Sequence, residues 1–78
     1  MSKDDTLDLH GSSHDEGRHR IEKFITDNLD TLPVKVITGH SSVFSRCVKD
    51  VADRYQLFCY EQHHMNPGCW VVLKSPWF

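Results

Sequence analysis

Apolar and polar residues alternate over residues 6–10 (Thr-Leu-Asp-Leu-His), which predicts a short strand. Leu7 and Leu9 would face the core of the protein. Asp8 and His10, which are two residues apart, would then share the opposite face.

Two stretches repeat apolar residues at helical spacing. The first begins after a capping box formed by Ser13 and Glu16, and it ends before Leu32-Pro33, because the residue before a proline leaves the helical region. The second, about 43–55, follows a turn at 39–42 whose serines can cap a helix. The expected apolar positions are Ile21, Phe24, Ile25 and Leu29 in the first helix, and Phe44, Cys47, Val48, Val51, Ala52 and Tyr55 in the second.

Residues 34–38, 57–60 and 70–73 have the composition of strands, and a turn at 63–68 with Asn-Pro-Gly joins the last two. The order β-α-β-α-β-β predicts a two-layer α/β domain. Crossovers through a helix are right-handed and join parallel strands, so the first three strands should point the same way and the fourth should run back. Five of the six histidines, His10, His14, His40, His63 and His64, then belong to segments at one edge of the sheet, where open α/β sheets bind ligands.

The chain has 78 residues, of which 38% are hydrophobic, and this predicts one folded domain at 6–78 behind a flexible N-terminus at 1–5. Nine basic against eleven acidic residues give a formal charge of −2, so the whole domain does not attract a phosphate backbone strongly. Any affinity for nucleic acid must come from a local patch. Protonation of the histidines below about pH 6.5 should strengthen such binding.

The three cysteines are an odd number, and the polar start of the chain has no signal-peptide pattern. No apolar run is long enough to span a membrane. We therefore expect reduced thiols, a cytoplasmic location and no membrane partner.

Three short motifs follow one another along the chain. Leu7-Asp8-Leu9-His10-Gly11 precedes Glu16, Thr38-Gly39-His40-Ser41 ends the second strand, and Asn66-Pro67-Gly68 precedes the strand 70–73. This series resembles the L-D-L-H-G-x4-E opening, the T-G-x-G turn and the closing N-x-G of the Smr (small MutS-related) domain family, over roughly residues 6–74.

The resemblance implies a four-stranded mixed sheet in the order 1-2-4-3 with both helices on one face, similar to the C-terminal domain of bacterial translation initiation factor three. It also implies nucleic-acid binding and, as in several members, nicking of DNA or endonucleolytic cleavage of RNA. Asp8 and His10 correspond to the residues implicated in cleavage, and Thr38, Gly39 and His40 to those implicated in substrate contact.

The chain departs from the family pattern at two positions. Ser41 stands where the family has a second turn glycine, and a serine would fit poorly if that position needs a positive φ or a very close phosphate. Gly17 stands where the family usually has alanine, at a small cost in helix stability.

The histidines suggest an acid–base mechanism. Asp8 would orient and charge His10, which would take a proton from a ribose 2′-hydroxyl or from an attacking water, while His40 or His63 would protonate the leaving oxygen. Activation of an internal 2′-hydroxyl needs no metal, which favours RNA slightly over DNA. Alternatively, Asp8 and His10 are simply exposed residues on the solvent side of a strand.

Substrate binding is expected mainly at the turn 39–42, where backbone N–H groups and the positive end of the second helix can hold a phosphate. Arg46 lies one helical turn beyond Ser42 and would reinforce it. Arg18, with Arg20 and Lys23, either extends a basic track or is part of a solvated helix face. The expected nucleic-acid-binding set is Gly11, Arg18, Thr38, Gly39, Ser41, Ser42, Arg46 and His63, with Trp70, Trp77 and Phe78 as residues that can stack on bases or pack against a neighbour.

Two other functions remain open. One is a non-catalytic module that competes for a nucleic-acid or ribosomal site. The other is a zinc-stabilised protein-interaction domain, since Cys59, His63, His64 and Cys69 are residue types that zinc accepts, although their spacing matches no familiar zinc signature. We expect no cofactor, and the sequence leaves metal dependence, target and oligomeric state open.

Overall fold

The computed structural model describes residues 5–62 and 68–74. Its elements follow the predicted order: β1 (Thr6–Asp8), α1 (His14–Asp27), β2 (Val34–Ile37), α2 (Ser42–Arg54), β3 (Leu57–Glu61) and β4 (Cys69–Lys74). None of the helices within the described residues is both long and apolar enough to cross a membrane.

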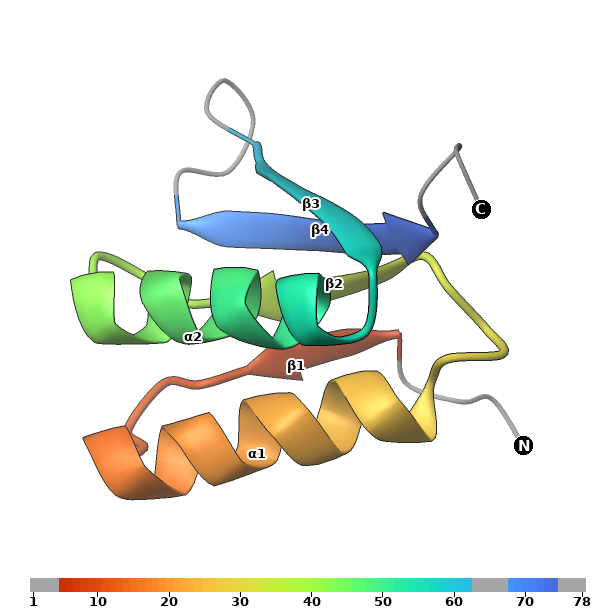
Figure 1. Ribbon diagram of the computed structural model, residues 1–78. Helices are drawn as coiled ribbons and strands as arrows, with labels where there is room; N and C mark the ends of the chain where they lie inside the picture. The colour runs from red at the N-terminus through yellow and green to blue at the C-terminus, as the bar shows by residue number, and fades with distance from the viewer. Residues whose placement is uncertain (1–4, 63–67, 75–78) are drawn as a thin grey trace.

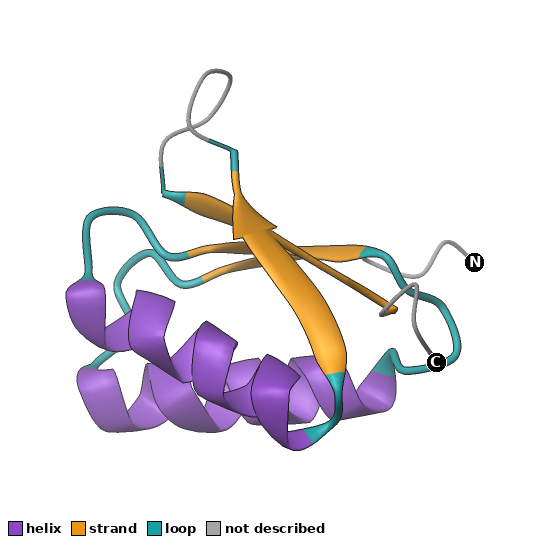
Figure 2. Cartoon of the chain, turned by 45° about the horizontal axis from the view of Figure 1, so that its top comes forward, coloured by secondary structure: helices purple, strands orange, loops and turns teal. Residues whose placement is uncertain are grey.

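The strands form one mixed sheet in the order β1-β2-β4-β3. β1 and β2 are parallel, and β4 is antiparallel to both β2 and β3 (Figure 1). Both helices lie on the same face of this sheet, and the described residues leave the other face open (Figure 2). The predicted two-layer α/β fold and its strand order are therefore confirmed.

The core lies between the helices and the sheet. Ile21 and Ile25 of α1, Val36 of β2, Val48 of α2 and Val72 of β4 are all fully buried. Leu9 is buried and Leu7 packs against the same cluster, as the alternation predicted. The apolar stripe of α2 ends one turn earlier than expected, because Tyr55 is the C-cap residue and is 39% exposed.

Serine side chains start both helices. The Ser13 hydroxyl accepts a hydrogen bond from the Glu16 N–H at 3.2 Å, and the Ser41 hydroxyl accepts one from the Phe44 N–H at 3.2 Å. Each serine satisfies an N–H group that the first helical turn leaves without a partner. The predicted N-caps are therefore confirmed.

Gly17 of α1 packs directly against the aromatic ring of Phe44 of α2. A Cβ atom added at Gly17 would overlap Cε1 and Cζ of the Phe44 ring. The His14 ring and the same phenyl ring form a T-shaped pair, with the centroids 5.7 Å apart and the planes at 85°. The departure from alanine at this position thus has a packing reason.

Candidate functional site

The ends of β1 and β2 open into a cleft of about 330 Å³. Two segments that are distant in the sequence, residues 8–12 and 37–41, line the cleft together with Phe44. Parallel pairing sets Asp8 beside Ile37, and the Leu9 N–H donates to the Ile37 carbonyl at 3.2 Å. The structure thus brings the Asp8–Gly11 motif and the Thr38–Ser41 turn to one edge of the sheet, as the sequence predicted.

Asp8 holds the backbone of the loop that follows β1. Its Oδ1 atom accepts a hydrogen bond from the backbone N–H of His10 at 2.9 Å, whereas the sequence suggested a contact with the His10 side chain. Gly11 then takes a φ of +80°, which favours glycine. Arg20 of α1 donates to the hydroxyl of Ser12 at 2.7 Å and ties the loop to the helix. Asp8 and His10 are both exposed, so a substrate can reach them.

Thr38 holds the loop that follows β2, residues 38–41, in place. Its N–H and its hydroxyl both donate to the Gly68 carbonyl, at 2.7 and 3.0 Å, and the Gly39 N–H donates to the same oxygen at 3.1 Å. Thr38 is only 5% exposed. Its polar groups are thus engaged inside the protein, and we assign it a positioning role rather than the substrate contact that the resemblance implied.

The close approach of the loop after β2 also requires a glycine at position 68. Gly68 has a φ of +87°, and a Cβ atom there would overlap the carbonyl group of Gly39. Its N–H donates to the Glu61 carboxylate at 3.1 Å. Gly68, the last residue of the closing motif, therefore supports the turn of the second motif, although 28 residues separate Gly39 from Gly68 in the chain.

The turn 39–42 has the conformation that its residues prefer. Gly39 carries the positive φ, +62°, while Ser41 has a φ of −80° and caps α2. Serine therefore fits the position where the family has a glycine, without backbone strain.

Only part of this turn is free to hold an anion. The N–H groups of Thr38, Gly39 and Ser41 already donate within the protein. Those of His40, Ser42 and Val43 have no acceptor among the residues that the structure describes. The first turn of α2 contains no acidic residue, whereas that of α1 contains Asp15 and Glu16, so the α2 end favours an anion more.

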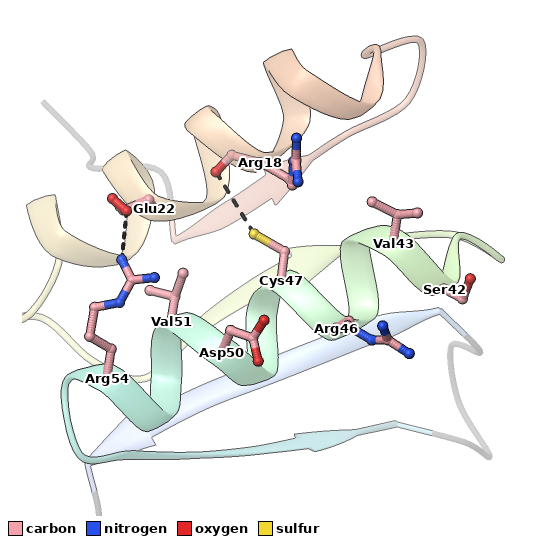
Figure 3. Close-up of a pocket in the computed structure, with 9 residues that line it drawn as sticks. All are labelled: Arg18, Glu22, Ser42, Val43, Arg46, Cys47, Asp50, Val51 and Arg54. Atoms are coloured by element: carbon pink, nitrogen blue, oxygen red, sulfur yellow. Dashed lines mark hydrogen bonds and ion pairs between the residues drawn. The ribbon is translucent and has the colours of Figure 1, made fainter.

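Three of the expected binding residues line a different hollow. Arg18, Ser42 and Arg46 lie in a groove of about 460 Å³ between α1 and α2 (Figure 3). Asp50 and the ion pair between Arg54 and Glu22, 2.9 Å long, also line it. Cleft and groove adjoin at the start of α2, where Ser41 lines the first and Ser42 the second.

The cations of α1 do not form a free basic track. Arg18 pairs with Asp15 at 2.7 Å, Lys23 pairs with Asp27 at 3.1 Å, and Arg20 is bonded to Ser12. Arg46 of α2 makes no ion pair or hydrogen bond with any residue in the described ranges. It is therefore the most available of the arginines near the start of α2.

The zinc hypothesis gains no support from the two cysteines in the hairpin. Cys59 pairs with Val72 and packs against the core, whereas Cys69 pairs with Ile37 on the opposite face of the sheet. His63 and His64 lie outside the described residues. Within those residues no three of His, Cys, Asp and Glu are grouped so that they could hold a metal ion.

Trp70 is a core residue. It is 7% exposed, its indole N–H donates to the Ser45 hydroxyl at 3.3 Å, and the ammonium of Lys49 lies 5.2 Å from its ring centroid. It packs against its neighbours and is not available to stack on a base. Trp77 and Phe78 lie outside the described residues.

Two features were missed by the sequence analysis. Glu61 and Ser45 support the loops through contacts with Gly68 and Trp70, and no local pattern marks them because their partners are distant in the chain. Phe58 and Tyr60 are half exposed on β3. Strict alternation with Leu57 and Cys59 would have placed these two aromatic residues on the face away from the helices.

Comparison with known proteins gives no family or relative from which the function of the cleft could be inferred. No protein-family model matches the chain, and no curated protein is significantly similar to it.

Proposed function

We propose that this domain binds nucleic acid at the cleft between the ends of β1 and β2 and cleaves a phosphodiester bond there, with RNA as the preferred substrate. The observation that carries the proposal is the cleft itself, in which the Asp8–Gly11 and Thr38–Ser41 segments lie side by side. The resemblance of both segments to Smr motifs supports the same conclusion. The free cysteine thiols within the described residues fit a reducing, cytoplasmic setting.

In the proposed reaction, neutral His10 takes the proton of a ribose 2′-hydroxyl, and the oxygen attacks the adjacent phosphorus atom. The bond from phosphorus to the 5′-oxygen breaks, and protonated His40 gives its proton to that oxygen. The products are a 2′,3′-cyclic phosphate and a 5′-hydroxyl. The reaction therefore needs one imidazole in its neutral form and the other in its protonated form.

Asp8 contributes by position. Its hydrogen bond to the His10 backbone fixes the end of β1 and thereby the place from which the imidazole extends. The N–H groups of His40, Ser42 and Val43 have no acceptor among the described residues and lie at the positive end of α2, where they would hold the phosphate. Arg46 would add a charge-assisted contact from the next turn of the helix.

The test incubates labelled single-stranded RNA, DNA of the same sequence and supercoiled DNA with the protein, with and without a chelator. His10→Ala and His40→Ala should each abolish RNA cleavage, while the control His19→Ala, an exposed histidine of α1 that does not line the cleft, should keep full activity. Mass spectrometry should find a cyclic phosphate on the product. Full activity of the His10 and His40 variants would refute the catalytic assignment, and cleavage of DNA alone would refute the preference for RNA.

The second candidate function is a non-catalytic module that occupies a nucleic-acid or ribosomal site. It is favoured by the use of the Asp8 carboxylate on a backbone N–H rather than on an imidazole, and by the net charge of −2. Binding of RNA without cleavage in the same assay would select this function.

A further inference from the structure

The open face of the sheet is unusually apolar at its β3–β4 side. A sheet with one solvated face normally carries polar residues there. Here the side chains of that face include Phe58 and Tyr60 of β3, and Cys69, Val71 and Leu73 of β4. Among the described residues, three of the four large hydrophobic side chains that are exposed, Ile37, Phe58 and Tyr60, lie on this face.

The accessible part of this surface is small. Phe58 is 50% exposed, Tyr60 45% and Ile37 36%, while Cys69 and Val71 are already buried. These three side chains offer roughly 250–300 Å² in total. A specific protein interface needs about 800 Å² from each partner, so these three side chains would supply only about a third of one, whereas their area is sufficient for a few flat rings.

The two aromatic rings of β3 are half exposed and can accept such rings. Phe58 and Tyr60 are two residues apart on one face of the strand, with ring centroids 6.3 Å apart and planes at 43°. They are therefore not stacked on each other. Nucleobases stack on aromatic side chains in this kind of setting on a sheet, and the interaction tolerates any base.

The strand register leads from these rings to the cleft. Tyr60 pairs with Val71, Val71 with Lys35, and Lys35 with Thr6, so one row crosses the whole sheet. In the next row Ile37 pairs with Asp8, and both line the cleft. Three strand spacings separate β3 from β1, a distance of about 14 Å, which a strand of a few nucleotides can span.

Lys35 lies midway along this path. It is exposed on the open face, and among the described residues of that face it is the only cation. One ammonium group can neutralise one phosphate of a strand that crosses the sheet. Binding along this path should thus depend mainly on stacking and only weakly on charge.

We propose that Phe58 and Tyr60 form a stacking platform that receives unpaired bases of a single-stranded nucleic acid and directs the strand across Lys35 to the Asp8–His10 cleft. This inference rests on the proposed function, and it names the substrate class as unpaired strands read without regard to sequence. It also assigns the open sheet face, rather than the arginine-lined groove between the helices, as the route of the substrate.

The first test measures fluorescence anisotropy with a labelled oligothymidylate of about eight nucleotides, which has no 2′-hydroxyl and so reports binding without the proposed cleavage. Phe58→Ala and Tyr60→Ala should each weaken binding by about 5- to 100-fold, while Tyr60→Phe should retain it. Tyr55→Ala is the matched control, because Tyr55 is 39% exposed but is the C-cap residue of α2 and does not belong to the sheet. A blunt duplex of the same length should bind more weakly than the single strand.

Two further measurements keep the outcome clear if a variant folds poorly. In the wild-type protein, the NMR signals of the Phe58 and Tyr60 rings should shift as oligothymidylate is added. The logarithm of the binding constant should fall with the logarithm of salt at a slope between about −0.7 and −1.4, the values for one phosphate contact at Lys35 and a second at Arg46 beside the cleft. A slope of about −2 or steeper would place the strand in the arginine-lined groove and overturn the inference.

The results separate this inference from the proposed function. If the wild type binds and cleaves RNA while Phe58→Ala and Tyr60→Ala bind as tightly as it does, the platform is refuted and the cleavage proposal stands. If the platform variants lose binding but the wild type never cleaves, the platform stands and the cleavage proposal fails. If the wild type binds no single strand at all, both fail. With a cleavable oligouridylate, the platform variants should raise KM and leave kcat unchanged.

Discussion

Replacing Gly17 by alanine should destabilise this domain, although alanine is the better helix former. In a solvated helix the change would stabilise the protein by about 1 kcal/mol. Here the new Cβ atom would overlap two carbon atoms of the Phe44 ring, which is only 5% exposed. Forcing an extra carbon into a packed core costs about 1–3 kcal/mol. The net effect should be a loss of about 1 kcal/mol, or roughly 4–8 °C in Tm for a domain of this size.

Urea unfolding followed by circular dichroism gives the free energy of unfolding for each member of a double-mutant cycle. Leucine has no atoms that correspond to Cε1 and Cζ, so Phe44→Leu removes the overlap. In that background Gly17→Ala should stabilise the domain by up to about 1 kcal/mol, which gives a coupling energy of about 1–3 kcal/mol between the two sites. Stabilisation by Gly17→Ala in the wild-type background, or the same effect in both backgrounds, would refute the reasoning. Because Phe44 also lines the cleft, Gly17→Ala should lower nucleic-acid binding as well.

Three other predictions concern the loops and the thiols. Gly68→Ala should lower the free energy of unfolding, measured in urea, by about 2 kcal/mol or more, because residue 68 has a φ of +87° and the new Cβ would meet the Gly39 backbone. A variant as stable as the wild type would contradict this. Ser41→Ala should cost about 1 kcal/mol through loss of the N-cap, whereas Ser41→Gly, which introduces the residue of the Smr pattern, should cost only a few tenths. A gain in stability on Ser41→Gly would show that the serine strains the turn. Burial raises the pKa of Cys47, Cys59 and Cys69 above the usual 9.0. The unfolded chain therefore releases these thiol protons at a lower pH than the folded protein does, and the free energy of unfolding should fall as pH rises above 9.0. A triple Cys→Ala variant serves as the control for the last prediction, since its stability should fall less over that pH range.

Local periodicity was sufficient for the secondary structure and for much of the fold. The alternation at residues 6–10, the apolar spacing of the two helices and the capping serines depend on neighbours within one or two turns, and a single sequence contains this information. The crossover through α1 then makes β1 and β2 parallel, which brings the Asp8–Gly11 and Thr38–Ser41 segments to one edge of the sheet.

The tertiary structure decided which atoms of these segments are free to act. Thr38 donates its polar groups to Gly68, Asp8 binds a backbone N–H instead of an imidazole, and Arg18 lies in a separate groove. It also decided that Gly17 leaves room for the ring of Phe44 from the other helix. These outcomes depend on contacts between residues that are distant in the chain and on competition among donors for the same acceptor. Residue type and spacing determine where a segment lies, but only the packed structure determines what its polar groups bind.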